Sequence, residues 1–159
     1  MNRLLKVQFD PRFLERLVEV VQQETGVRAT GGMLQVSREW LFHPKVPLFL
    51  SSVHATGQAS LDGLIGISFS RDMSHYLNRI QRPPGLMAER LMAQFAELLA
   101  SHIRMDVRFR FWPPLFGGVL ESEGCVLAVG VPHGRVEWLF LDGFLPPKPP
   151  RPQEKEMIS

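Results

Sequence analysis

The hydrophobic positions of the first 26 residues recur with the period of a helix. Asp10 precedes them as a helix-capping residue, Pro11 occupies the first turn, and Gly26 follows as a natural stop. The pattern predicts a helix over residues 11–25, with its apolar face formed by Phe13, Leu14, Leu17, Val18 and Val21.

The next part of the chain changes to patterns typical of strands. Residues 46–53 read VPLFLSSV, a nearly continuous apolar run, as in a buried strand. Residues 61–70 read LDGLIGISFS and place Ile65, Ile67 and Phe69 on one face. We expect these two segments to pair antiparallel. The sequence between residues 27 and 42 is compatible with short strands or with a loop around Trp40.

Two further helices are predicted in the middle of the chain. Ser70 is a suitable N-cap, and Pro83 ends the second helix. The apolar face of that helix is expected at Met73, Tyr76, Leu77 and Ile80. The third helix, over residues 86–103, has the strongest helical pattern. Its expected core face is Ala88, Leu91, Phe95, Leu98 and His102.

The rest of the chain predicts strands and then a tail. MDVRFRFW alternates, and CVLAVGV and RVEWLFL read as a hairpin joined at residues 132–134. The order of elements indicates an α+β fold, a largely antiparallel sheet with helices packed on one face. We therefore expect one domain over residues 1–144. Residues 145–159 are rich in proline and charge and are expected to form a solvated, disordered tail.

Composition narrows the class of protein. The chain has 159 residues, 45% of them hydrophobic, and a net charge of +2. It lacks a membrane-length apolar run and a cleavable leader, so we expect a cytoplasmic protein without a membrane span. Arg104, Arg108 and Arg110 alternate with aromatic residues that we expect to point into the core. With so small a charge excess, nucleic-acid binding is not predicted.

Familiar catalytic motifs are missing from the sequence. It contains no phosphate-binding glycine loop, no GxSxG and no HExxH. The five histidines have no helical metal-binding spacing, and Cys125 opens an apolar strand, where a buried and inert thiol is expected. We therefore predict no metal site and no cofactor in this chain.

The third helix carries a second face with small side chains. On a helical wheel Ala93, Ala96 and Ala100 fall within about 40° of Glu89. One interpretation is packing against another helix of the same domain. The other is a docking face for a partner protein, with Glu89 offering a carboxylate to a lysine or arginine. The residues of the predicted docking face are Glu89, Met92, Ala93, Ala96, Glu97 and Ala100.

The order and spacing of these features resemble the CheX-like family of chemotaxis phosphatases, which also includes CheC and FliY. The matching segments are GLIGISFSRDMSHYLNRI (63–80), AERLMAQFAELLASHI (88–103) and FRFWPPLFGG (109–118). They correspond to the family's strand-to-helix junction, its long helix with a Glu-x-x-Asn motif, and its strand ending in proline. The resemblance covers roughly residues 10–142.

The resemblance implies a site on the long helix. In this family the glutamate bonds a lysine of a response-regulator receiver domain, and the asparagine orients the water that attacks the aspartyl phosphate. The receiver supplies the metal ion, Mg²⁺. The glutamate corresponds to Glu89, whereas Met92 occupies the asparagine position. A thioether donates no hydrogen bond, so the resemblance implies impaired catalysis. It also implies a possible homodimer formed through the sheets.

Three functions remain open from the sequence. The first is a signalling adaptor that binds a receiver domain or self-associates. The second is an active aspartyl-phosphate phosphatase that holds water with another amide or hydroxyl group. The third is a small-molecule-binding α+β domain, which predicts a closed apolar pocket. A receiver-docking role requires Glu89 to be accessible to solvent.

Overall fold

The computed structural model describes residues 3–42 and 45–145. The chain begins with β1 (Arg3–Leu4), β2 (Val7–Gln8) and α1 (Pro11–Thr25). It continues through β3 (Gly32–Phe42), β4 (Phe49–Thr56), β5 (Ala59–Phe69), α2 (Arg71–Arg79) and α3 (Pro84–Ile103). It ends with β6 (Asp106–Phe111), β7 (Gly118–Val131), β8 (Gly134–Asp142) and β9 (Phe144–Leu145). The predicted tail, apart from Leu145, lies outside the described residues.

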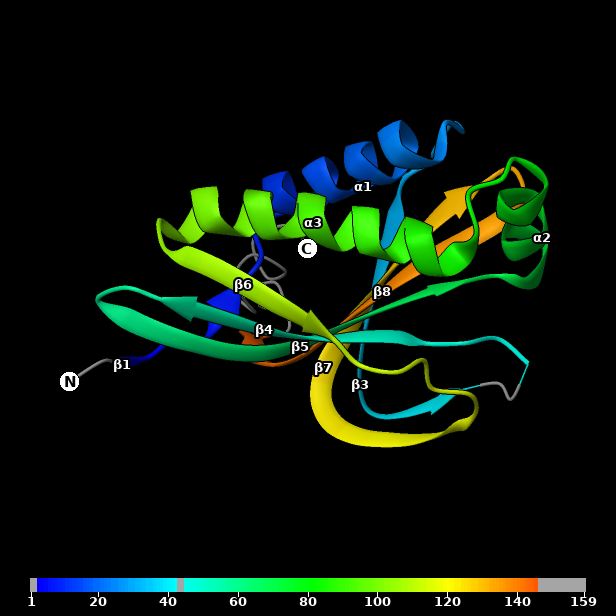
Figure 1. The fold of residues 1–159 in the computed structure, drawn as a ribbon. Coiled ribbons are helices and arrows are strands. Elements are labelled where there is room, and N and C mark those ends of the chain that lie inside the picture. The colour runs from blue at the N-terminus through cyan, green and yellow to red at the C-terminus, as the bar shows by residue number, and fades with distance from the viewer. Residues whose placement is uncertain (1–2, 43–44, 146–159) are drawn as a thin grey trace, which may run out of the picture.

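The main sheet is antiparallel along the order β3-β7-β8-β5-β4-β6. β1 adds a short parallel pairing to β5, and β2 pairs with β9 in a separate two-stranded sheet. Figure 1 shows α1 and α3 side by side over one face of the sheet, with α2 at its end. The predicted α+β class, with helices on one face of an antiparallel sheet, is confirmed.

The local signals explain where the helices begin and end. The Asp10 carboxylate accepts a hydrogen bond from the Phe13 amide at 2.7 Å, and Gly26 ends α1 in the left-handed conformation that favours glycine. Ser70 caps α2 by accepting from the Met73 amide at 3.4 Å. α1 spans the predicted residues, and α3 begins two residues before its predicted start.

The strand predictions are confirmed in kind and corrected in extent. β4 and β5 pair antiparallel, with Val53 opposite Gly63, although β4 begins three residues later than the apolar run. The ambiguous segment 27–42 contains β3, a long strand at the edge of the sheet. Proline and glycine near residues 113–118 separate β6 from β7, which bends strongly along its length in Figure 1.

The main core lies between the helices and the sheet. Its centre is aromatic: the Phe95 ring lies 6.3 Å from Phe9, 6.0 Å from Phe13 and 5.7 Å from Trp138, measured between ring centroids. The opposite sheet face carries a smaller apolar cluster, which consists of Leu48, Leu50, Val126, Leu139 and Leu141. Both faces of the central strands are therefore apolar, which explains the nearly continuous apolar runs in their sequence.

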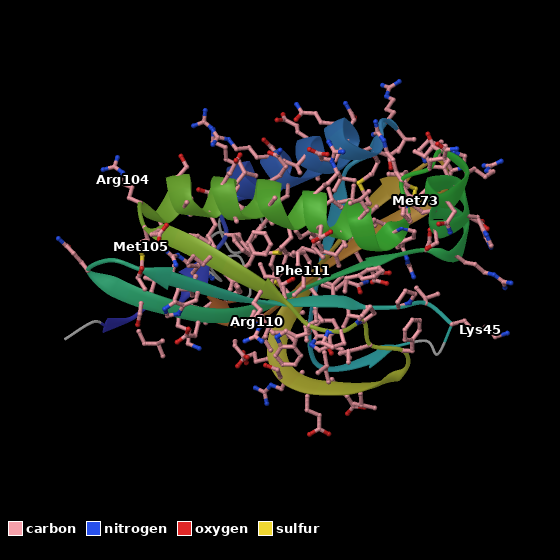
Figure 2. All side chains as sticks on the ribbon, in the orientation of Figure 1. Lys45, Met73, Arg104, Met105, Arg110 and Phe111 are labelled. Atoms are coloured by element: carbon pink, nitrogen blue, oxygen red, sulfur yellow. The ribbon has the colours of Figure 1, made fainter. Side chains whose placement is uncertain are left out.

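Side chains alternate along β6 as the sequence predicts. Phe109 and Phe111 are half-buried against the main core, whereas Arg108 and Arg110 are exposed. Figure 2 shows Phe111 directed toward the helices and Arg110 directed away from them. The aromatic side chains of β6 therefore contribute to packing and do not form a stacking surface beside the arginines.

Gly124 provides a test of how closely β7 and β8 approach. A methyl group at this position would overlap the carbonyl oxygen of Phe140 and the side chain of Leu141. We expect Gly124→Ala to lower the free energy of unfolding by about 1–3 kcal/mol, because rigid backbone must move. Chemical denaturation followed by circular dichroism measures this loss.

Gly85→Ala is the matched control for that substitution. A methyl group there would meet only the Phe49 ring, at an ordinary contact distance of 3.6 Å. Because alanine favours a helix over glycine, we expect this variant to be unchanged or stabilised by up to about 1 kcal/mol. Equal losses in the two variants would contradict the described approach of β7 and β8.

Candidate functional site

The predicted docking face lies on α3, which packs on the sheet beside α1. Pro83 precedes the helix without a side-chain cap, and Pro84 fits its first turn, where no amide hydrogen is needed. The helix ends at Arg104, whose left-handed backbone returns its amide to the carbonyl of Ala100. These terminal residues set the register, and the core decides which side of α3 meets solvent.

The buried face of α3 matches the predicted one at Ala88, Leu91 and Phe95 and differs from it elsewhere. Leu98 is only partly buried and His102 is exposed, although both were expected in the core. Because α3 is covered by the sheet and by α1, its buried arc is wide and includes residues predicted on the outer face. The buried residues of α3 are Met87, Ala88, Leu91, Met92, Phe95, Ala96 and Leu99.

The predicted docking face is therefore divided. Met92 and Ala96 belong to the buried side, with Met92 0% exposed. Glu89, Ala93 and Glu97 are exposed, and Ala100 is half-buried. We call the accessible remainder the α3 face, defined by Glu89, Ala93, Glu97 and Ala100. It offers two carboxylates around small side chains.

Glu89 is free to meet a partner. Its side chain is exposed, and within residues 3–42 and 45–145 it takes part in no ion pair. Its neighbour Arg90 is engaged instead, with its Nε 3.1 Å from Oε2 of Glu24 on α1. That ion pair connects the two helices and directs the Arg90 side chain to Glu24 on α1.

Met92 is sealed in the core three residues after Glu89. Successive positions three apart on a helix lie about 60° from each other, so one can face solvent while the other faces the core. The sulfur side chain cannot reach a partner without movement of α3 or its neighbours. The position that the resemblance assigns to a water-holding amide therefore contains an inaccessible thioether.

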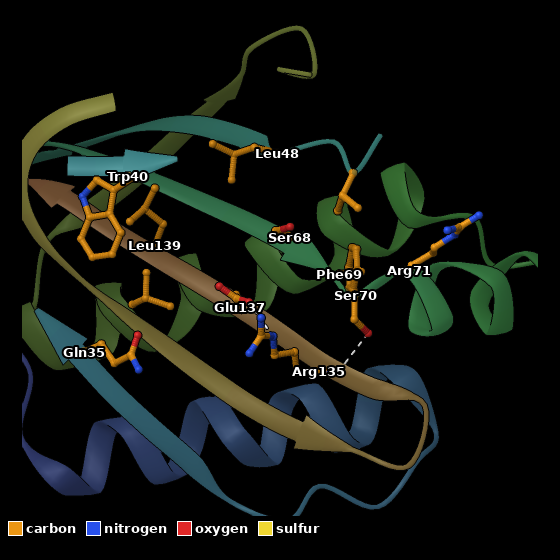
Figure 3. A pocket seen from close by; sticks show the side chains of 12 residues that line it. Gln35, Trp40, Leu48, Ser68, Phe69, Ser70, Arg71, Arg135, Glu137 and Leu139 are labelled. Atoms are coloured by element: carbon orange, nitrogen blue, oxygen red, sulfur yellow. Dashed lines mark hydrogen bonds and ion pairs between the residues drawn. The ribbon is translucent and has the colours of Figure 1, made fainter. Parts of the chain in front are cut away.

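The open face of the sheet contains a groove that sequence reasoning did not identify. It has a volume of about 470 Å³, and Trp40, Leu48 and Leu139 form its apolar part. Figure 3 shows Arg135 and Glu137 among its lining residues, and their side chains form an ion pair at 2.8 Å. The sequence did contain a signal for this groove. In the segment RVEWLFL, the polar residues Arg135 and Glu137 alternate with the buried residues Val136 and Trp138.

This groove differs from the closed apolar pocket expected of a small-molecule-binding domain. Its wall includes charged and polar side chains, and Arg135 is largely exposed to solvent. The described residues thus supply a shallow mixed surface on the open face. The groove lies on the opposite side of the sheet from α3, so the two features belong to separate surfaces.

The histidines are dispersed in the described part of the chain. His54 Nδ1 lies 2.5 Å from the Asp62 carboxylate on the open sheet face, and the His133 ring stacks on Tyr76 at 4.1 Å between centroids. No group of three or more potential metal ligands is found among the described residues. Within the same residues, no helix is long and apolar enough to cross a membrane.

Cys125 lies in the interior of β7 and is fully buried. Burial raises the pKa of its thiol from 9.0 to about 11, because the thiolate loses its hydration. The thiol is therefore protonated near neutral pH and inaccessible to reagents. The predicted inert role of Cys125 agrees with this environment.

Comparison with known proteins shows similarity at the level of structure. No family model and no curated protein matches the chain. The chemotaxis protein CheX of Desulfovibrio desulfuricans matches with a TM-score of 0.54 and 17% identity, over 82% of this chain and 96% of that one. The chain therefore has a CheX-like fold.

Two further solved structures, of a CheC-like protein and of a CheX protein, match this chain more weakly. A CheC-like superfamily protein from Shewanella sp. PV-4 matches with a TM-score of 0.49 and 13% identity, covering 82% of this chain and 95% of that one. CheX of Borrelia burgdorferi, solved as a complex with CheY, BeF3 and Mg²⁺, matches with a TM-score of 0.42 and 13% identity. The latter match covers 81% of this chain and 94% of that chain.

The burial of Met92 can be tested by substitution. We expect Met92→Asn to lower the free energy of unfolding by about 2–4 kcal/mol, because an amide replaces a thioether in an apolar site without hydrogen-bond partners. Ala93→Asn is the control: it adds the same amide on the exposed side and should cost less than about 1 kcal/mol. Denaturant titrations of both variants measure the difference, and equal costs would refute the described rotation of α3.

The environment of Cys125 predicts a pH dependence of stability. The unfolded thiol ionises near its ordinary pKa of 9.0, whereas the folded thiol ionises at about 11. Its contribution is fully present below pH 9 and is lost as the pH rises toward 11. We expect the stability advantage of the native chain over Cys125→Ala to fall by about 2 kcal/mol across this interval. Paired denaturation curves check this, and a difference independent of pH would contradict it.

Proposed function

We propose that this chain is a CheX-like signalling domain that binds a response-regulator receiver domain through the α3 face and lacks asparagine-assisted dephosphorylation. The proposal joins three supports: the CheX-like fold, the resemblance of residues 88–103 to the family's long helix, and the accessibility of Glu89. The last two supports concern the same helix, α3.

The observation that carries the proposal is that Glu89 is exposed whereas Met92, three residues later, is buried. The carboxylate of Glu89 is exposed and has no ion-pair partner among the described residues, as a lysine-binding group requires. Met92 is 0% exposed and donates no hydrogen bond. The helix can therefore contribute the docking half of the family's site without the half that positions water.

The chemistry of acyl-phosphate hydrolysis explains why this loss matters. An aspartyl phosphate is already activated, so a phosphatase contributes mainly by holding water in line with the phosphorus atom. A side-chain amide can do this, because it both donates and accepts hydrogen bonds. Gln94 is the nearest amide on α3, but it lies about 140° around the helix from Glu89.

The α3 face also suits a partner that supplies the reacting groups itself. A receiver domain of this signalling class would bring its own Mg²⁺ together with the phosphorylated aspartate. The α3 face would add carboxylates beside that site, and its small residues Ala93 and Ala100 would allow close approach of the partner backbone. No cofactor held by this chain is required for binding.

Receiver binding and dephosphorylation can be measured in one experiment. Receiver domains of the same organism are charged with acetyl phosphate, and both their affinity for this chain and their rate of phosphate loss are recorded. We expect binding without acceleration. Glu89→Gln should weaken binding about tenfold, because a charge-assisted hydrogen bond becomes a neutral one.

Glu123→Gln is the matched control, since it removes the same charge from an exposed position on β7. Its affinity for the receiver should equal that of the native chain. Accelerated phosphate loss that disappears in Glu89→Gln would identify an active phosphatase and overturn the impaired catalysis. Binding to no charged receiver would overturn the docking proposal itself.

A further inference from the structure

A second surface, on the far side of α1 from α3, forms a groove against the edge of the sheet. This α1–β3 groove has a volume of about 510 Å³. Its floor is apolar, where Leu14 and Val18 of α1 meet Leu34 and Leu127 of the sheet. Its rim is acidic, because α1 also contributes Glu15 and Glu19, and the lining contains no basic residue.

The two rim carboxylates are available to a cation. Glu15 and Glu19 are both exposed, and neither forms an ion pair within the described part of the chain. They lie one helical turn apart, about 6 Å along α1. An occupant of this groove should therefore combine apolar groups with positive charges at a similar spacing.

The sheet continues the apolar floor beyond the groove. β3 pairs with β7 on one side only, so it is an edge strand of the sheet that the structure describes. Val36 lies opposite Cys125 and therefore on the helix-covered face, yet it is 57% exposed. Leu34 and Val36 thus form an apolar strip beside an edge that natural proteins usually cover.

The last described strand, β9, ends close to the start of α1. Leu145 pairs in parallel with Gln8, only three residues before Pro11, and is itself 40% exposed. Because the pairing is parallel, Phe144–Leu145 runs in the same direction as Val7–Gln8, toward the first turn of α1. The described chain therefore ends near Pro11, which lines the α1–β3 groove.

The sequence after Leu145 has the composition that the groove requires. Residues 146–152 read PPKPPRP, so five prolines surround Lys148 and Arg151. Such a segment favours a polyproline II helix, which rises about 3 Å per residue and needs no backbone partners. Pro11 to Glu19 spans about 12 Å along α1, which about four such residues can follow. Lys148 and Arg151 would then be about 9 Å apart, within reach of Glu15 and Glu19.

We propose that residues 146–152 bind in the α1–β3 groove of their own chain. The prolines pack on Leu14, Val18 and Leu34, and Lys148 and Arg151 face the carboxylates of Glu15 and Glu19. In this position the segment covers the apolar strip of β3 and shields the sheet edge from other chains. This docking is independent of the α3 face and replaces the solvated tail that composition alone predicts.

Paramagnetic relaxation in the full-length chain tests the proposal. Gln153→Cys carries a nitroxide label, and Cys125 stays unlabelled because it is fully buried. We expect selective broadening of the Leu14, Val18 and Leu34 amide signals, with no broadening at Leu77 on α2.

Glu15→Lys with Glu19→Lys should remove most of the broadening, and adding Lys148→Glu with Arg151→Glu should restore it. High salt should weaken it, because the ion pairs lie near solvent.

Controls make each outcome decisive. Glu121→Lys with Glu123→Lys applies the same charge reversal to exposed positions of β7 outside the groove lining and should leave the broadening unchanged. Broadening absent from the groove amides, or unaffected by reversal at Glu15 and Glu19, would overturn the proposal. So would broadening that appears only when a labelled chain is mixed with an isotope-enriched one, since the occupant would then be a second copy.

Discussion

The aromatic contacts beneath α3 control which side chains of that helix reach solvent. The Phe95 ring packs among Phe9, Phe13 and Trp138, and these rings come from the N-terminal segment, α1 and β8. Because large rings pack in few arrangements, this cluster sets the rotation of α3 about its axis. With that rotation, Leu91, Met92 and Leu99 enter the core and Glu89 points outward. The outer surface of the helix is therefore a consequence of its inner packing.

The same packing gives Glu89 and Met92 different environments. The Glu89 carboxylate lies on the exposed side of α3, where it can bind a cationic group because such binding needs only one accessible carboxylate. Holding water for phosphoryl transfer would need a further accessible hydrogen-bonding group, whereas the side chain of Met92 is buried in the core. The fold thus keeps an accessible carboxylate at Glu89 while it buries the side chain three residues later. A CheX-like fold by itself does not imply phosphatase activity.

The two sides of the molecule present different surfaces. The helix-covered side has acidic features on both α1 and α3, and the open face of the sheet combines an apolar cluster with the Arg135–Glu137 pair. Edge strand β3 connects the two, since its residues contribute to the groove beside α1 and to the groove on the open face. The two grooves nevertheless use different side chains of β3, because neighbouring residues of a strand point to opposite faces of the sheet.

Local patterns determined most of the secondary structure and the fold class. Capping by Asp10 and Ser70, and the alternation along β6, depend on neighbours in the chain, so the sequence alone predicted α1, α2 and the facing of Phe109 and Phe111. The segment that became β3 stayed ambiguous, because an edge strand is specified by its partner β7, far along the sequence. The long helix was predicted but its outer face was misplaced, with Met92 and Ala96 expected outside. A helical wheel describes angles between residues, whereas only packing against the sheet and α1 decides which angle faces the core.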